Sequence, residues 1–361
     1  MWNKSYDLRS LVLDVELTSY CNLRCPQCSR TDEHNNLEKK SWLPLHSVSI
    51  DQFKNWFPPK VICTLKQIHF SGTYGDPGMC KDLAQIIDYI IDEGTCKVSI
   101  NTNGSMRDSD YWWDIAAKGQ RRLKIILDID GINQEMHGFY RRGSDLEKVL
   151  NVVEAISTTP VEVSVLTVLF KHNEDYLEQI RDMVKARASN YITFDEVEGN
   201  NFQGGPIYKF KDEDGNDQQL EQVTRKDREQ GLVRESRRVR DHRHIEIVEL
   251  YNKIDCLAAS QQNLKIQSSG QVTPCCYMST PLETASLFNP NSFNRMITTY
   301  GGKDEDINPV AQEFIDNPDS FNLDHTPLLD IINGEWFTKT LPDSWQTKSP
   351  CFACSKVCGV V

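Results

Sequence analysis

The alternation of short apolar runs with amphipathic stretches over the first 200 residues constrains the fold of this chain more than any other feature. The apolar runs predict strands, and the segments between them have helical periodicity. Because a repeated strand–helix–strand order gives parallel strands with right-handed crossovers, we expect an α/β fold with an open sheet or a full or partial barrel. The six predicted strands are LVLDVEL (11–17), KQIHF (66–70), KVSIN (97–101), LKIILDI (123–129), VEVSVLTVLF (161–170) and YITFDEV (191–197).

Two of the intervening segments carry clear helix signals. KDLAQIIDYIIDEG (81–94) has Ile and Leu at i, i+3 and i+4 spacing, and Gly94 is expected to end it. In SDLEKVLNVVEAI (144–156), Ser144 and Glu147 have the spacing of a capping box. We therefore predict that Ser144 caps this helix.

The unusual residues of the chain follow directly after predicted strands. The stretches are CNLRCPQC (21–28), SGTYGDPG (71–78), NTNGS (101–105) and DGINQ (130–134). In parallel α/β folds the chemistry lies at the C-terminal ends of the strands. The sequence thus predicts that these four loops meet on one rim.

Length and charge limit the classes of function. A chain of 361 residues has room for one α/β barrel of roughly 200 to 250 residues and a smaller module. A net charge of −12 argues against a broad electrostatic contact with nucleic acid or anionic lipid. No stretch approaches a membrane span, and the N-terminus lacks a secretory signal pattern, so we expect a cytoplasmic protein.

The composition changes after residue 200 and predicts three regions: 1–200, a charged connection over 201–248, and a C-terminal region over 249–361. The connection is expected to be solvated and partly mobile. The most basic stretch of this connection is RESRRVRDHRH (234–244). An alternative interpretation is that it contacts a phosphate or an acidic substrate. NLKIQSSGQVTPCCY (263–277) predicts a β-hairpin that carries cysteines at its end.

Twelve cysteines are present, and nine of them fall into three groups: Cys21, Cys25, Cys28; Cys256, Cys275, Cys276; and Cys351, Cys354, Cys358. Clustered cysteines in a reducing compartment indicate metal before disulfides. Three thiolates in one short loop can hold three corners of a cubane iron–sulfur cluster, whereas a structural zinc site needs four ligands. Such a cluster keeps one iron open for a small molecule.

The CxxxCxxC motif of Cys21, Cys25 and Cys28, placed after the first strand of a βα series, resembles the radical S-adenosylmethionine (SAM) superfamily. The resemblance implies a partial (β/α)6 barrel with a 4Fe-4S cluster on these cysteines. It also implies that the open iron chelates SAM, whose reductive cleavage gives a 5′-deoxyadenosyl radical that takes hydrogen from the substrate. An electron donor such as a flavodoxin or ferredoxin would then be a partner.

The same resemblance suggests contacts with SAM. Gly72, Thr73, Tyr74, Gly75 and Asp76 occupy the place of the glycine-rich segment that meets the SAM amino group. The stretch 101–104 after the third strand resembles a further family segment. The pairs Asp130-Gly131 and Tyr140-Arg141, which follow the fourth strand, resemble the DG and YR pairs of the family. Two departures are Gln27, where many members carry an aromatic residue against the adenine, and Asp128, where serine is common. The further expected SAM-site residues are Asn101, Asn103, Asp128, Arg141 and Asn173.

The C-terminal cysteines resemble the auxiliary-cluster domains called SPASM and Twitch. Cys256, a spacer to Gly270, and Cys275 after four intervening residues fit that pattern, and a distant CxxC follows. The resemblance implies one auxiliary 4Fe-4S cluster in a small domain made of a β-hairpin and a helix, with zinc as the alternative metal. The expected ligands are Cys256, Cys275, Cys351 and Cys354, with Cys276 and Cys358 as substitutes.

Three functions are compatible with these features. The first is a radical SAM oxidoreductase or maturase that modifies a peptide or protein. The second is a dehydrogenase or epimerase of the same family acting on a small sugar or aminoglycoside. The third, from another class, is a non-catalytic iron–sulfur or zinc protein, which predicts no cleavage of SAM.

Overall fold

The computed structural model describes residues 6–199, 206–224, 254–288, 307–347 and 350–358. Their main feature is an eight-stranded sheet with the strand order β12-β11-β1-β4-β5-β6-β7-β8. The six strands from β1 to β8 in this order are all parallel, which confirms the predicted α/β fold and all six predicted strands. They are β1 (Val12–Val15), β4 (Gln67–Phe70), β5 (Lys97–Thr102), β6 (Leu123–Asp128), β7 (Glu162–Leu169) and β8 (Ile192–Glu198).

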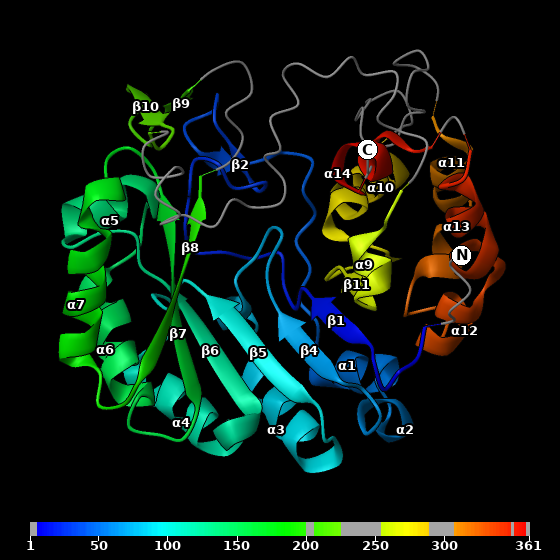
Figure 1. Cartoon of the computed structure of the whole chain (residues 1–361), viewed down its shortest axis with the longest axis horizontal. Coiled ribbons are helices and arrows are strands. Elements are labelled where there is room, and N and C mark those ends of the chain that lie inside the picture. The colour runs from blue at the N-terminus through cyan, green and yellow to red at the C-terminus, as the bar shows by residue number, and fades with distance from the viewer. Residues whose placement is uncertain (1–5, 200–205, 225–253, 289–306, 348–349, 359–361) are drawn as a thin grey trace.

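Amphipathic helices follow these strands and pack against one another in series. Their apolar faces contribute to one large buried core with the strand residues that point the same way. Figure 1 shows α3, α4, α6 and α7 arranged along the sheet from β4 to β8. The helices of this region are α1 (Ile50–Trp56), α2 (Pro59–Ile62), α3 (Leu83–Glu93), α4 (Ser109–Gly119), α5 (Gln134–Tyr140), α6 (Leu146–Ile156) and α7 (Leu177–Arg187).

The two predicted helix ends have different outcomes. Gly94 is the C-cap of α3, as predicted. The predicted capping box at α6 is wrong, because Asp145 is the N-cap and its side chain accepts a hydrogen bond from Lys148 N. Ser144 is instead buried, with its hydroxyl 2.9 Å from His137 Nε2. A carboxylate one position later thus takes the capping role.

The predicted C-terminal hairpin is confirmed as β11 (Asn263–Ile266) and β12 (Val272–Thr273), which are antiparallel. Gly270 has φ +88° in the turn, a backbone conformation that favours glycine. An unexpected feature is that β11 pairs in parallel with β1, with Lys265 opposite Asp14. The hairpin therefore extends the sheet of the N-terminal region.

The remaining C-terminal helices lie at the β11 end of the molecule, opposite α7 (Figure 1). Aromatic side chains of Phe314, Phe321, Trp336 and Phe337 pack there against each other, and Tyr6 contacts Phe337. The first described residue thereby contacts the C-terminal helices. The helices are α9 (Leu257–Ser260), α10 (Cys276–Phe288), α11 (Pro309–Asp316), α12 (Leu328–Asn333), α13 (Leu341–Ser344) and α14 (Phe352–Cys358), with a π-helix over Trp336–Thr340.

Part of the predicted connection is more ordered than its composition indicates. Residues 206–224 contain an antiparallel hairpin of β9 (Ile207–Lys211) and β10 (Asp217–Glu221), so this part has regular structure although most of its side chains are exposed or half-buried. Phe210 and Leu220 are buried against the first cysteine loop, and Tyr208 donates a 2.9 Å hydrogen bond to Pro26 O. The basic stretch 234–244 lies outside the described residues. No helix within the described ranges is both long and apolar enough to cross a membrane.

Candidate cluster and cofactor site

The first cysteine loop begins at Cys21, six residues after the end of β1, and is held by its own backbone and by neighbouring loops. Leu23 N lies 3.4 Å from Cys21 Sγ, and Cys28 N donates to Cys25 O at 3.1 Å. Cys25 is buried, and Cys21 and Cys28 are partly buried in the same hydrophobic cluster. The three thiols therefore lie together under the β9–β10 hairpin.

Burial controls the state of these thiols. It raises the pKa of Cys25 to about 12, and the nearby Arg141 guanidinium opposes that shift. Burial likewise raises the pKa of Cys21 and Cys28. The thiols are therefore protonated before metal binding, and a bound metal would displace their protons.

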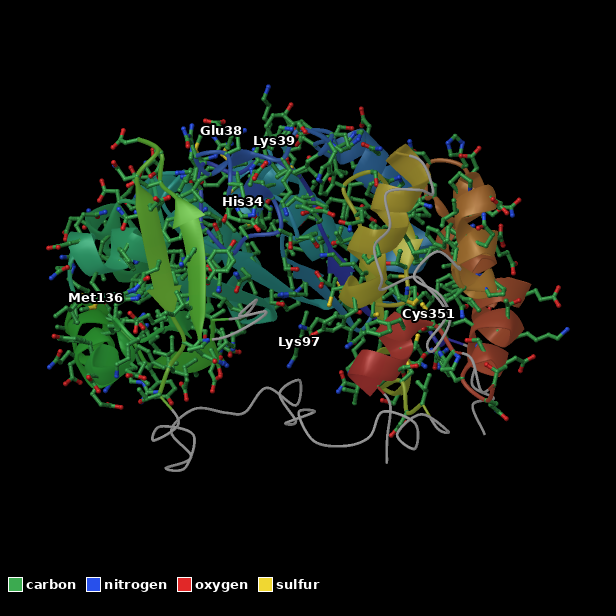
Figure 2. The ribbon with its side chains drawn as sticks, turned by 90° about the horizontal axis from the view of Figure 1, so that it is seen from above. His34, Glu38, Lys39, Lys97, Met136 and Cys351 are labelled. Carbon is green, nitrogen blue, oxygen red and sulfur yellow. The ribbon has the colours of Figure 1, made fainter. Side chains whose placement is uncertain are left out.

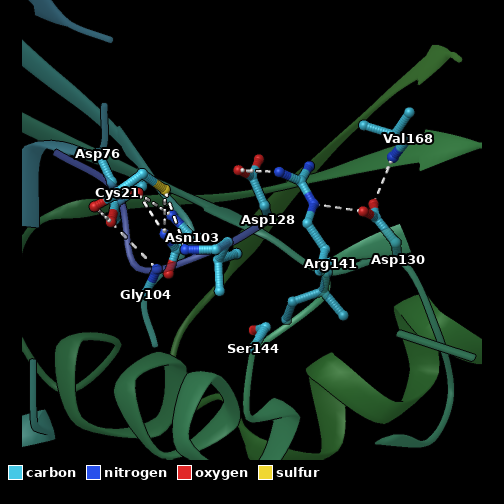
Figure 3. A network of polar contacts seen from close by, with 12 residues as sticks. Cys21, Asp76, Asn103, Gly104, Asp128, Asp130, Arg141, Ser144 and Val168 are labelled. Atoms are coloured by element: carbon cyan, nitrogen blue, oxygen red, sulfur yellow. Dashed lines mark hydrogen bonds and ion pairs between the residues drawn. The ribbon is translucent and has the colours of Figure 1, made fainter. Parts of the chain in front are cut away.

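Asp76 joins the glycine-rich loop to the loop after β5, as Figure 3 shows. Its carboxylate accepts hydrogen bonds from Asn103 N and Nδ2, both at 2.8 Å, from Thr102 Oγ1 at 2.7 Å and from Gly78 N at 2.8 Å. Asn103 Nδ2 is also 3.1 Å from Asn22 Oδ1 and 4.0 Å from Cys21 Sγ. Asp76 thus orients Asn103 toward the first cysteine.

Arg141 lies between two buried carboxylates on the other side of this site (Figure 3). Its Nη1 is 3.0 Å from Asp128 Oδ2, and its Nε is 2.6 Å from Asp130 Oδ2. The other oxygen of Asp130 accepts from Val168 N at 2.6 Å. The position that departs from the family pattern, Asp128, is therefore the ion-pair partner of Arg141.

We expect Asp128 to make the stability of the protein depend on pH. Burial raises the pKa of Asp128 to about 7 from 3.8, against the opposing charge of Arg141. The folded state then holds a proton that the unfolded chain releases, so this contribution to stability is present below pH 4 and is lost as the pH rises to about 7. The free energy of unfolding should therefore fall less between pH 5 and pH 8 in Asp128→Asn than in wild type, by on the order of 1–3 kcal/mol.

Urea unfolding at both pH values measures this difference. Asp195→Asn is the matched control, because Asp195 lies in the same row of the sheet but is exposed. A wild-type pH dependence that persists unchanged in Asp128→Asn would contradict the assignment.

The other expected SAM residues are placed as follows. Gly72 to Gly75 form a loop packed on the backbone before Cys21, and the Tyr74 ring contacts Trp42. Asn101 lies beside Asp128. Burial raises the pKa of the Asp128 carboxyl, and the side-chain hydrogen bond from Asn101 lowers it by a smaller amount. Asn173 is fully buried, and its amide bonds the backbone of Phe170, Val168 and Asp130. Contact of these residues with SAM stays a prediction.

Sequence reasoning missed two buried side chains at the site. The sequence presents Asp130 only as part of a DG pair, although it forms the closer ion pair with Arg141. Glu16 has the pattern of an ordinary strand residue, although its carboxylate is buried and bonds the glycine-rich loop. Gln27, at the position where many members carry an aromatic residue, is buried with no hydrogen-bond partner for either amide atom among the described residues.

The structure also gathers the C-terminal cysteines. Cys256 shares a thiol contact with Cys358, and Cys351 with Cys354, while Cys275 lies close enough to Cys256 and Cys354 to influence them electrostatically. Cys358 O accepts from Asp255 N at 3.0 Å, and Cys276 is exposed. Figure 2 shows Cys351 beside the C-terminal helices, away from the loop of His34 and Glu38.

The donor chemistry at both places fits iron–sulfur clusters. No three His, Cys, Asp or Glu side chains in the described ranges could share a single metal ion. A cubane does not require that convergence, because each of its thiolates binds a different iron. The first site offers three thiols beside Arg141, and the second offers five.

Comparison with known proteins identifies relatives of the N-terminal region. Residues 15–184 match the radical SAM superfamily model. Over 186 residues the chain is 28% identical to a probable GTP 3′,8-cyclase of Methanocaldococcus jannaschii, covering 49% of this chain and 56% of the relative. Over 191 residues it is 26% identical to the GTP 3′,8-cyclase of Peptoclostridium acidaminophilum, covering 52% and 54%. The chain thus spans about half the length of these curated relatives.

One solved structure resembles nearly the whole chain. The crystal structure of Streptococcus suis SuiB bound to precursor peptide SuiA has a TM-score of 0.53 and 13% sequence identity. The match covers 98% of this chain and 71% of that one. At this identity the likeness shows a shared fold.

Proposed function

We propose that this chain, whose residues 15–184 match the radical SAM superfamily model, cleaves SAM reductively and uses the resulting radical to modify a peptide or protein. Cys21, Cys25 and Cys28 would hold a 4Fe-4S cluster. When bound, the cluster supplies one electron that breaks the C5′–S bond of SAM, giving methionine and a 5′-deoxyadenosyl radical that takes a hydrogen atom from the substrate. The electron would come from a flavodoxin or ferredoxin in the cytoplasm.

The observation that carries this proposal is the arrangement around Cys21. Three thiols occupy one loop at the C-terminal end of β1, and Asn103 and Arg141 approach them from the ends of neighbouring elements. Cys256, Cys275, Cys351 and Cys354 would hold an auxiliary cluster, with Cys358 close enough to replace one of them.

The choice of a peptide substrate rests on the likeness of fold. The curated relatives are GTP cyclases, and a triphosphate needs unpaired cations to offset its charge. Lys265 is paired with Asp14, and Arg141 with Asp128 and Asp130, whereas Arg30 and Lys40 near Cys28 form no carboxylate pair among the described residues. SuiB, of similar fold, is described as bound to a precursor peptide. A peptide is therefore our first choice, and a sugar or aminoglycoside is the alternative.

Anaerobic reconstitution with iron and sulfide, reduction with dithionite and addition of SAM tests the proposal. We expect 5′-deoxyadenosine and methionine in equal amounts by liquid chromatography and mass spectrometry, and faster formation with the true substrate. No 5′-deoxyadenosine above background, with both clusters intact, would support the non-catalytic iron–sulfur alternative. Acceleration by GTP would contradict the choice of a peptide.

A further inference from the structure

Glu16, the residue that follows β1, is a buried carboxylate that bonds the glycine-rich loop and has no part in the proposed chemistry. It is 1% exposed, and its Oε1 accepts hydrogen bonds from Tyr74 N at 2.6 Å and Gly75 N at 3.1 Å. Two N–H groups directed at one carboxylate oxygen fix a loop strongly, since hydrogen bonds to a charged acceptor are about twice as strong as neutral ones. Glu16 thus binds the backbone of the glycine-rich loop directly.

The loop that Glu16 holds lies against the chain that leads to the first cysteine. A Cβ on Gly75 would be 1.8 Å from Thr18 O, so only glycine permits this approach. Asp76 N donates to Tyr20 O at 2.9 Å, one residue before Cys21. The position of Glu16 therefore determines where the glycine-rich loop lies relative to the cysteine loop.

A buried carboxylate is stabilised by a nearby positive charge. Lys265 of the C-terminal hairpin is ion-paired with Asp14, which lies two residues before Glu16 on the same face of the strand, and its Nζ is 3.5 Å from Ser71 Oγ, next to the glycine-rich loop. Lys265 on β11 is 2% exposed, and its Nζ is 3.1 Å from Asp14 Oδ1. Glu16 N donates to Ile266 O at 2.9 Å, which continues the β1–β11 pairing up to Glu16. Burial raises the pKa of Glu16, and the Lys265 charge opposes that shift. Lys265 therefore favours the ionised form of Glu16.

We propose that Glu16 is a positioning residue that holds the Gly72–Asp76 loop for SAM, and that the buried Lys265 of the C-terminal hairpin, which contacts Asp14 and Ser71, supports it at the base of that loop. This inference rests on the proposed function for the role of the loop. It makes the hairpin that leads to Cys275 a structural part of the SAM site.

The test combines a readout of the loop with a readout of SAM binding. Hydrogen exchange of the segment containing Tyr74 and Gly75, followed by mass spectrometry, should be at least about tenfold faster in Glu16→Ala and in Lys265→Met than in wild type. With the reconstituted protein, equilibrium dialysis should give SAM dissociation constants raised at least about tenfold at unchanged iron content. Glu16→Gln, which keeps an acceptor oxygen, and Lys265→Arg should recover part of both losses.

Lys124→Met is the matched control, because Lys124 pairs with Glu162 on β6 and β7, away from the glycine-rich loop. It should leave the exchange and the affinity unchanged. The proposal would be overturned if Glu16→Gln and Lys265→Met both showed the hydrogen exchange and the SAM affinity of wild type. These two variants keep the test valid even if Glu16→Ala does not fold. If the wild-type protein bound no SAM but the variants still exchanged faster, the proposed function would be rejected. The contact of Glu16 with the loop would then still stand.

Discussion

Replacing Cys21, Cys25 and Cys28 together by alanine is expected to abolish 5′-deoxyadenosine formation and to leave roughly four iron atoms per chain, the content of one 4Fe-4S cluster. The first loop provides no other thiol, so the triple variant has no route to bind the SAM-chelating cluster. The C-terminal cysteines lie beside different elements, α9, α10 and α14, and keep their donor set. Iron analysis and absorbance near the thiolate-to-iron charge-transfer bands measure the remaining cluster, and liquid chromatography with mass spectrometry measures 5′-deoxyadenosine.

Two controls make this result specific. Cys63→Ala removes an exposed cysteine outside the three groups and should change neither iron content nor activity. Cys256, Cys275, Cys351 and Cys354 replaced together should remove the other half of the iron. Loss of all iron in the first triple variant would contradict two independent sites, and retained activity would contradict the role of the first loop.

The six central strands could be predicted because each is a short apolar run with turn or loop residues at its ends. The loops at their C-terminal ends were predictable for the same reason, since parallel strands place those ends on one rim. The pairing of β11 with β1 could not be predicted, because it joins Asp14 to Lys265 across 250 residues and neither strand carries a local signal for its partner.

The β9–β10 hairpin was hidden by its composition. Lys, Asp, Glu and Gln dominate 207–221, and the only buried apolar side chains in this range are Phe210 and Leu220. Two apolar residues on facing strands suffice because they pack on a cluster supplied by distant parts of the chain, including Leu23 and Phe170. Such burial depends on tertiary contacts that local patterns do not contain.

The site residues divide in the same way. Spacing indicated the cysteines, but the function of a carboxylate depends on its partners in space. Glu16 has the sequence environment of an ordinary strand residue, and its hydrogen-bond donors lie 58 residues away. Asp128 likewise could be recognised as an ion-pair partner only once Arg141 was seen to fold back onto β6.

Arg141→Met is expected to destabilise the protein by about 3–5 kcal/mol, because it leaves two buried carboxylates without their cation. Asp128 and Asp130 are 5% and 0% exposed, and each contacts a different nitrogen of Arg141. Arg141→Lys should recover only part of the loss, since an ammonium cannot reproduce the two-point geometry of the guanidinium. Urea unfolding at pH 7 measures both variants.

The adjacent Arg142 provides a matched control for this change. Its Nη1 is 2.8 Å from Glu213 Oε2, but the two side chains are 18% and 31% exposed. Such partly hydrated pairs contribute little, so Arg142→Met should cost about 1 kcal/mol or less. In the double variant Arg141→Met with Asp128→Asn, the removal of one unpaired charge should restore part of the stability. An Arg141→Met protein as stable as the Arg142→Met control would contradict the assignment of Arg141 as the shared counter-ion of this site.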